Sequence, residues 1–367
     1  MIQPKRENIR FLAKLMTILI VVELTKATHM HNSSITRDAC SDRIHISHLY
    51  YFRYYILRYD SMLVTNKDLM LPAVQRGYAV GAFNISNLES LLAVVEAAVE
   101  EESLVIVAVT PSSIKYAGLA YLGEMVKTAA ESASVSMSLH LDHGKDMDTI
   151  SKCIDAGFTS VMIDGSHLEF EENIALTKRV VDLARPKRIS VEAELGKLAG
   201  IEESTVNEKE AVLTDPDMAK EFVERTGVDA LAIAIGTSHG AYKFKGEPKL
   251  DFERLKLIRE KVDTLLVLHG ASSVPSWIIE KAVKYGAELS GARGIPEDHI
   301  RKAISLGITK INIDTDLRLA FTGGIREFLF KSPEIFDPRK ILVSAKEAMK
   351  EVVKSKMRLF GSSGKSS

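Results

Sequence analysis

The stretch VSMSLHLDHGKDMDTISKCIDAGFTSVMIDG (135–165) contains the unit from which most of the chain is built. Its first and last apolar runs, 135–141 and 160–165, have the length and composition of buried strands. Between them, residues 146–157 predict a helix with Asp146 as its N-cap and Gly157 at its end. A strand, a helix and a strand in this order predict a βαβ unit with two parallel strands.

The same alternation of apolar runs and amphipathic stretches continues from Met62 onward, and helices are also predicted over 87–102 and 215–227. Near-continuous apolar runs are typical of parallel strands covered on both faces. Eight strand–helix units predict a (β/α)8 TIM barrel. A doubly wound open sheet is the alternative, but it would normally have a Gly-x-Gly-x-x-Gly turn after the first strand, where this chain has AFNISN. The predicted strands are 80–83, 104–109, 135–141, 160–165, 189–195, 230–236, 264–270 and 310–316.

Composition limits the possible partners and the compartment. The 367 residues carry a formal net charge of −1, which provides no basic surface for nucleic acid. The two cysteines, Cys40 and Cys153, lack CxxC spacing and predict neither a disulfide framework nor a thiolate zinc site. These features fit the reducing cytoplasm, where disulfides are rare.

Residues 1–61 differ from the rest of the chain because they contain no glycine and have nine Lys and Arg against five Asp and Glu. The apolar run 15–22 is too short to span a membrane, which takes ~20 residues. It has the length of a signal-peptide core, but no convincing cleavage site follows. We interpret 1–61 as a poorly structured extension, or as the product of a start codon assigned upstream of Met62. The barrel domain is then 62–367.

Three histidines lie just past apolar runs, at the positions where barrel enzymes place their catalytic groups. They are His143, His239 and His269. If these runs are neighbouring strands, the three imidazoles converge at one rim. Three protein ligands with an open coordination position are typical of catalytic zinc, and imidazole also suits iron, cobalt or nickel. Taken singly, each histidine could instead be a hydrogen-bonded structural residue.

Carboxylates accompany these histidines. Asp142 precedes His143 and is a candidate general base, or a partner that orients a metal ligand. Glu192 and Glu194 alternate along a predicted strand and would face the same side. Their burial requires a cation, which could be a metal ion or a lysine or arginine. Other polar residues at strand ends are Asn84, Thr110, Asp164, Asn312 and Asp314.

Two loops have the composition of a phosphate site. HGASS (269–273) and NIDTD (312–316) follow the seventh and eighth predicted strands, where barrels commonly hold phosphate. Backbone N–H groups with Ser or Thr hydroxyls form an anion cradle, although HGASS could also be an ordinary capped turn. Lys243 and Arg318 are either anion contacts or surface charges. The stretch 194–205 is either a mobile lid that brings Glu202 or Glu203 over the site, or a solvated loop.

The motifs AFNISN, LDHG, VMIDGSH, VEAELG, GTSHGAYKFKGEP, LHGASS and NIDTDLR occur in this order. With this set and spacing, the chain from about Met62 onward resembles the class II, zinc-dependent fructose-bisphosphate aldolases. The resemblance implies reversible cleavage of fructose 1,6-bisphosphate to dihydroxyacetone phosphate and glyceraldehyde 3-phosphate by a cytoplasmic homodimer or homotetramer. The same chemistry on tagatose 1,6-bisphosphate is the nearest alternative. A non-catalytic zinc-binding barrel that serves as a partner subunit is an alternative of another class.

The resemblance also implies a role for individual residues. Zn²⁺ would lie on His143, His239 and His269, with Glu194 at an alternative metal position. Asp142 corresponds to the catalytic Asp that takes the C4 hydroxyl proton, and Glu202 to a loop Glu that exchanges the C3 proton. A monovalent cation, Na⁺ or K⁺, often lies near the C1 phosphate loops. The residues expected to hold the ketose and its phosphates are Asn84, Gly240, Lys243, Gly270, Ser272, Asn312, Asp314, Thr315 and Arg318.

The chain departs from the family pattern at two places. Ala199 and Gly200 stand where the lid usually has paired glycines, and Ser273 stands where a glycine is frequent. Neither departure removes an expected metal ligand.

Overall fold

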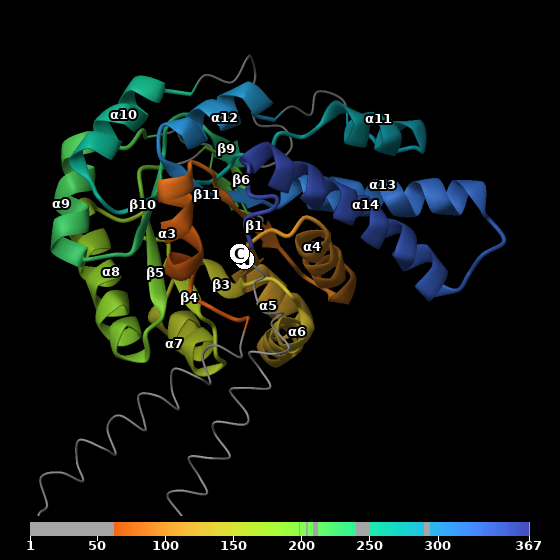
Figure 1. Cartoon of the computed structure of the whole chain (residues 1–367), viewed down its shortest axis with the longest axis horizontal. Helices are drawn as coiled ribbons and strands as arrows, with labels where there is room; N and C mark the ends of the chain where they lie inside the picture. Colours follow the sequence, from red (N-terminus) through yellow and green to blue (C-terminus); the bar gives the residue numbers. More distant parts are fainter. Residues whose placement is uncertain are drawn as a thin grey trace, which may run out of the picture. The chain divides into compact units, whose positions relative to one another are not determined.

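A computed structural model describes residues 62–197, 199–202, 205–207, 212–239, 250–289 and 294–366, and the extension 1–61 lies outside these residues. Eight parallel strands form a closed barrel in the order β1-β11-β10-β8-β5-β4-β3-β2. Helices surround this barrel (Figure 1). The barrel strands are β1 (Val80–Asn84), β2 (Val105–Val109), β3 (Met137–Gly144), β4 (Ser160–Ile163), β5 (Ser190–Leu195), β8 (Ala230–Ile233), β10 (Leu265–Leu268) and β11 (Ile308–Ile313).

Each of the eight predicted strands is a strand of this barrel, so the predicted TIM-barrel fold is confirmed. The chain closes on itself because the first strand pairs with the last, Val80 opposite Lys310 and Phe83 opposite Ile313. The strands are buried along their whole length, as their near-continuous apolar sequences predict. The three predicted helices are also present, as α4 (Leu88–Glu100), α7 (Met147–Asp155) and α9 (Pro216–Thr226).

The remaining described elements surround the barrel or precede it. They are α3 (Asn66–Arg76), α5 (Pro111–Ala117), α6 (Leu119–Ser132), α8 (Phe170–Ala184), the 3-10 helix η2 (Arg185–Lys187), α10 (Phe252–Lys261), α11 (Ser276–Lys284), α12 (Glu297–Ser305), α13 (Thr315–Lys331) and α14 (Pro338–Phe360). In the described part of the chain, no helix combines the length and the apolar character needed to cross a membrane.

Helix α3 covers the amino-terminal end of the barrel. Thr65 and Asp68 form a capping box that fixes the start of the helix. Leu69 and Met70 are buried in a cluster with apolar residues from the first halves of the strands, including Val80 and Ile106. The opposite, carboxyl end of the strands is therefore the end at which a site can open.

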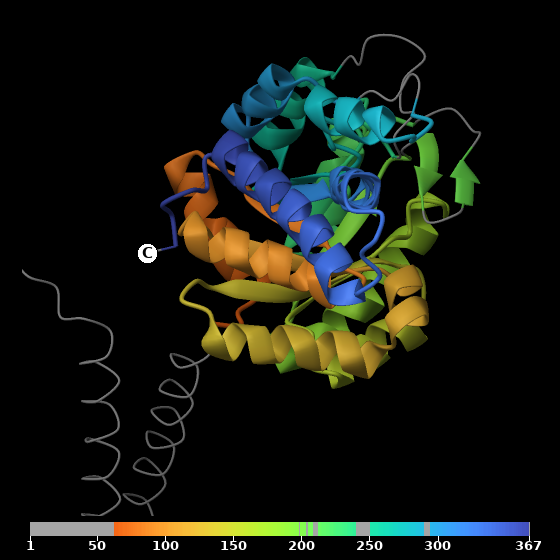
Figure 2. The same ribbon diagram turned by 90° about the vertical axis from the view of Figure 1, so that its right-hand side faces the viewer.

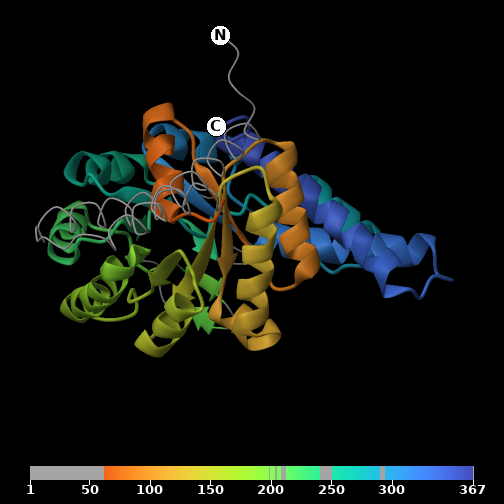
Figure 3. The ribbon, with the colours of Figure 1, turned by 60° about the horizontal axis from the view of Figure 1, so that its bottom comes forward.

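Helix α14 packs against α13 and α4, as Figures 1 and 2 show. It also reaches the barrel, because the N–H of Ala79, just before β1, donates to the carbonyl of Phe360 at 3.1 Å. Beyond the barrel wall, α13 and α14 run side by side as a projecting hairpin (Figure 3). The hairpin and the first strand are thus held together by the last helix.

The stretch 194–205, expected to be a lid or a solvated loop, contains strand structure instead. Strand β6 (Ala199–Glu202) pairs with β7 (Thr205–Asn207) and with β9 (Ser238–His239) in a small three-stranded sheet. The register places Gly200 opposite His239. The segments after β5 and β8 are therefore joined by backbone pairing.

Candidate active site

A β-bulge at the end of β3 brings two adjacent polar residues to the same site. Leu141 pairs with Val161 and Gly144 with Ile163, so Asp142 and His143 together lie opposite a single residue of β4. His143 has φ +51°, in the left-handed region. In a regular strand, Asp142 and His143 would point to opposite faces, and the extra residue of the bulge changes this. The sequence predicted His143 just past the strand, whereas β3 continues to Gly144.

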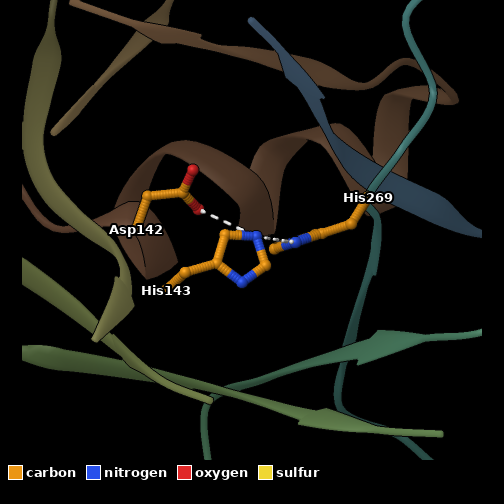
Figure 4. A group of neighbouring side chains, drawn as sticks. All are labelled: Asp142, His143 and His269. Carbon is orange, nitrogen blue, oxygen red and sulfur yellow. Dashed lines mark hydrogen bonds and ion pairs between the residues drawn. The ribbon is translucent and has the colours of Figure 1, made fainter. Parts of the chain in front are cut away.

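The imidazoles of His143 and His269 face one another at the centre of the site (Figure 4). Nε2 of His143 lies 2.9 Å from Nδ1 of His269. Both side chains are buried, and their rings meet edge to face with centroids 4.6 Å apart. Two buried ring nitrogens this close need a proton or a cation between them, because two bare lone pairs repel.

The outer nitrogen of each imidazole is bound to a carboxylate. Nδ1 of His143 lies 3.1 Å from Asp164, and Nε2 of His269 lies 2.8 Å from Glu192. A carboxylate at one nitrogen fixes the proton there and leaves the other nitrogen as an acceptor. Both inward-facing nitrogens then have the lone pair that a metal ligand needs, which is the arrangement found around histidine-bound metals.

A buried lysine holds one of these carboxylates. Nζ of Lys310, on β11, lies 2.8 Å from Glu192 Oε2 and 3.0 Å from Oε1. It also lies 3.4 Å from Nε2 of His140, whose Nδ1 is 2.9 Å from Ser160 Oγ. The cation expected for Glu192 is therefore provided by Lys310, and His140 is a buried neighbour of that lysine.

Asp142 is held by two asparagines from neighbouring strands. Nδ2 of Asn84 donates to Oδ2 at 2.9 Å, and Nδ2 of Asn312 donates to Oδ1 at 2.8 Å. Oδ1 also lies 4.0 Å from Nε2 of His143. Asn84 and Asn312 were predicted to contact the substrate, and in this structure their amides orient Asp142.

The pKa values of these groups follow from burial and from Lys310. Burial would raise the pKa of Asp142, but electrostatic interactions with the His143 imidazole and with Lys310 outweigh it and keep the pKa of this carboxyl below its usual range. Burial would likewise raise the pKa of Glu192, but Lys310 holds it at about 2. Burial lowers the pKa of His269, and it lowers that of His140 to about 3. Asp142 and Glu192 are therefore ionised and His140 and His269 are neutral, and metal binding requires ionised carboxylates and neutral imidazoles as ligands.

The donor set fits a metal ion. One ligand atom from each of Asp142, His143 and His269 lies within 4.8 Å of the others, and all three residues are buried. Glu194 Oε2 lies 3.8 Å from Nδ1 of both imidazoles, a position consistent with an alternative ligand. Imidazole and carboxylate donors without a thiolate suit zinc and other first-row divalent ions.

For four predicted site residues, the structure describes either the backbone alone or no atoms. Gly240 and Lys243 are not among the described residues, and for Glu202 and His239 the description covers the backbone, in β6 and β9. Nearby, Gly270 has φ +60°, and a Cβ there would lie 2.7 Å from the carbonyl oxygen of Ser238. The loop after β10 therefore runs against the strand that carries His239.

The remaining predicted substrate residues line the rim. Ser272 is buried in the loop after β10, and Thr315 begins α13 directly after Asp314. Arg318 pairs with Asp314 at 2.7 Å and is largely exposed. Both border a cavity of about 400 Å³ that Asn84 and Ser112 also line. The cavity thus extends from Asn84, which donates to Asp142, to the guanidinium group of Arg318 at the rim.

Sequence reasoning missed two supporting residues. Lys310 stands at the start of the predicted strand 310–316, and its place two positions before Asn312 on the same strand face is the signal of an internal partner for a carboxylate. The sequence pattern marks Asp164 only as a polar residue at a strand end, and in the structure it is the partner of His143 Nδ1.

Comparisons with known proteins agree over this whole region. Residues 64–288 and 289–365 match the family model described as "Fructose-bisphosphate aldolase class-II". A Thermus caldophilus protein named fructose-bisphosphate aldolase is 54% identical over 305 residues, which cover 83% of this chain and 100% of that protein. A Helicobacter pylori protein of the same name is 47% identical over 306 residues, again 83% of this chain and 100% of that protein.

Solved structures give the same result. The crystal structure of the YdjI aldolase from Escherichia coli K12 has a TM-score of 0.68 and 35% identity, and the match covers 83% of this chain and 100% of that one. A putative fructose-1,6-bisphosphate aldolase from Coccidioides immitis has a TM-score of 0.70 and 30% identity over 82% of this chain and 97% of that one. The chain therefore belongs to the class-II fructose-bisphosphate aldolase family, a family of generally metal-dependent carbon–carbon lyases.

Proposed function

We propose that this protein reversibly cleaves fructose 1,6-bisphosphate to dihydroxyacetone phosphate and glyceraldehyde 3-phosphate. The observation that carries the proposal is the convergence of Asp142, His143 and His269 at the carboxyl rim of the barrel. The choice of substrate is supported by the 54% identity with the Thermus caldophilus fructose-bisphosphate aldolase, whose whole length is matched. The folded catalytic unit is taken as 62–367, in a cytoplasmic homodimer or homotetramer.

We assign His143, His239 and His269 as ligands of Zn²⁺, with Glu194 at an alternative position. A bound zinc ion would act as a Lewis acid toward the negative charge that develops on the substrate's carbonyl oxygen. Glu192 and Asp164 orient the two described imidazoles so that their inner nitrogens remain acceptors. We also propose that a Na⁺ or K⁺ ion binds beside the loop after β10.

Asp142 acts as the general base. Ionised at neutral pH and held by two amide donors, it accepts the proton of the substrate's C4 hydroxyl. The C3–C4 bond then breaks, the C4 oxygen becomes the aldehyde oxygen of glyceraldehyde 3-phosphate, and the bonding electrons remain with C3. Glu202 returns a proton to C3, which completes dihydroxyacetone phosphate. Gly240, Lys243, Gly270, Ser272, Asn312, Asp314 and Thr315 hold the ketose and its C1 phosphate, and Arg318 holds the distal phosphate.

A coupled cleavage assay on fructose and tagatose 1,6-bisphosphates tests the proposal. Activity on the fructose substrate that EDTA abolishes and zinc or cobalt restores is the expected result. Borohydride added with substrate should leave the enzyme active, because the mechanism forms no imine. Trapping of a Schiff base, or faster cleavage of the tagatose substrate, would contradict the proposal.

A further inference from the structure

Helix α13, helix α14 and the segment before α12 all pack behind the loop 269–274. This loop follows β10 and contains Gly270 and Ser272. Lys356, on α14, is 1% exposed, and Asp316, in the first turn of α13, is 0% exposed. Nζ of Lys356 lies 2.7 Å from Asp316 Oδ2 and also donates to Ser273 Oγ. Buried charges persist when they are paired, so this ion pair is a fixed part of the wall behind the loop.

The second oxygen of Asp316 holds the backbone of the loop. The N–H of Val274 donates to Oδ1 at 3.0 Å. Val274 has φ +43°, a conformation that is strained for a β-branched residue and is maintained only by surrounding contacts. Asp316 follows Asp314 and Thr315 on the same helix start. One carboxylate therefore connects the two loops that the proposed function assigns to phosphate.

The other side of the loop is backed by the segment before α12. The N–H of Ile295 donates to the carbonyl of Ser272 at 3.2 Å, and a Cβ on Gly294 would lie 2.2 Å from the carbonyl carbon of Ser273. The loop backbone is thus confined between this segment and the Asp316–Lys356 pair. Removing the pair would release the loop on the side that faces α13 and α14.

We propose that Lys356 is a positioning residue for a substrate phosphate, and that it acts through Asp316 and Ser273 on loop 269–274. This inference rests on the proposed function, because it takes the two loops as the phosphate site. Nζ of Lys356 is engaged by Asp316 and Ser273, so Lys356 acts on the loop rather than on the phosphate. Asp142 and His143 lie on β3 and keep their own supports. The effect therefore falls on substrate binding, hence on KM, and not on the bond-breaking step.

Two variants and a matched control test this role. Lys356→Met removes the cation, and Lys356→Met with Asp316→Leu removes both charges, so that no unpaired charge stays buried. Lys350→Met is the control, because Lys350 lies on the same helix and pairs with Glu100 of α4 and Glu347 of α14. The measurements are KM and kcat for fructose 1,6-bisphosphate, calorimetric binding of inorganic phosphate, and metal content of the purified protein.

We expect both Lys356 variants to bind phosphate more weakly and to raise KM, each by about 10–100-fold, as for a misplaced binding group. Their kcat and metal content should match those of the wild type, and Lys350→Met should match it throughout. Lys356→Arg should recover part of the loss, because it restores a cation for Asp316. If Lys356→Met does not fold, the double variant decides the question.

Unchanged phosphate affinity and KM in a folded Lys356 variant would overturn the inference. So would a loss that appears equally in kcat or in metal content, since that pattern indicates a general structural role. A wild-type protein that binds phosphate but does not cleave the sugar would refute the proposed function. The phosphate affinities of the Lys356 variants, measured by calorimetry, would still test the positioning role. A wild-type protein that binds no phosphate would refute the positioning role itself.

Discussion

Lys310 and Glu192 form an ion pair inside the barrel, with Nζ 2.8 Å from Oε2 and both side chains almost completely buried. Glu192 is also the partner of His269, so the pair determines which nitrogen of that imidazole carries the proton. The lysine of β11 thereby sets the ligand state of a histidine that directly follows the neighbouring strand, β10. This relationship leads to the first prediction.

Lys310→Met should destabilise the fold by about 3–5 kcal/mol, because it leaves the Glu192 carboxylate buried without its cation. Combining it with Glu192→Gln should recover much of this stability but weaken zinc affinity by about 10–100-fold, since the His269 partner is no longer charged. Denaturant unfolding and chelator competition measure the two effects. The exposed Lys340→Met serves as the control, and a double variant with wild-type zinc affinity would contradict the prediction.

Replacing either described imidazole should remove metal binding. We expect His143→Ala and His269→Ala to be purified with little zinc and to lose cleavage activity, because each removes an inward-facing nitrogen of the site. Elemental analysis and the coupled assay check this result. His167→Ala, at an exposed position, should retain both properties. Normal zinc content in the His143 and His269 variants would place the metal elsewhere.

Asp142→Ala should separate chemistry from metal binding. We expect kcat to fall by about 10²–10⁴-fold through loss of the general base, while zinc content stays near that of the wild type. Alanine is preferable to asparagine here, because Asn84 and Asn312 both donate to Asp142 and an amide at this position would present a third donor. A variant with kcat within a factor of about ten of the wild type would exclude this role.

The seam between α4 and α14 should make stability depend on pH. Hydrogen bonds from Lys354 and Lys350 lower the pKa of Glu100, and a hydrogen bond from Lys350 lowers that of Glu347, each from an ordinary value of 4.5. Because the folded pKa values are lower than the unfolded ones, their contribution is complete above the unfolded pKa and is lost as the pH falls through the folded values. Solvent screening keeps each exposed pair within about 1 kcal/mol.

Lys350→Met should therefore lower the free energy of unfolding at pH 7 by about 1 kcal/mol. The difference from wild type should shrink steadily below pH 4, where the carboxylates become protonated. Unfolding curves measured from pH 3 to pH 7 test this expectation, with Lys340→Met as the control. A difference that stays constant across this range would show that the charges of the seam do not cause it.

A protein that begins at Met62 should keep the activity and thermal stability of the full chain. Removing residues through Thr65 as well should lower stability by about 1 kcal/mol or more through loss of the helix cap. It also removes the backbone bonds that join Met62 and Val64 to Met137, at 2.7 and 2.8 Å. Melting temperatures of the two truncated proteins measure the difference. Equal melting temperatures would show that this segment adds no stability.

The barrel could be predicted from the sequence because each strand is an uninterrupted apolar run and each run is followed by a helix signal. The strand limits were less exact, as with β3, which continues through Asp142 and His143 to Gly144. A bulge depends on pairing with β4, and pairing partners are not encoded in a local pattern. The apolar run alone therefore gave no sign that Asp142 and His143 share one face.

The site could be predicted where a residue acts directly and could not where it acts through another. His143, His269 and Asp142 lie at the carboxyl ends of strands that could be recognised, so their approach was a consequence of the fold. The partners Lys310 and Asp164 depend on which strands are adjacent and on side-chain direction. Lys356 lies on a helix with several other lysines. Only its burial distinguishes it from Lys350 and Lys354, which both pair with Glu100 in the seam between α4 and α14.

The position of α14 has a consequence for synthesis of the protein. This helix follows every barrel strand in the sequence, yet it holds the start of β1 through Phe360 and contributes Lys356 behind the loop 269–274. A nascent chain that has left the ribosome as far as Asp316 contains all eight strands and none of this support. We therefore expect the barrel to reach its final structure only after the last helix has emerged. A chain truncated before α14 should fold incompletely and be degraded by quality-control proteases.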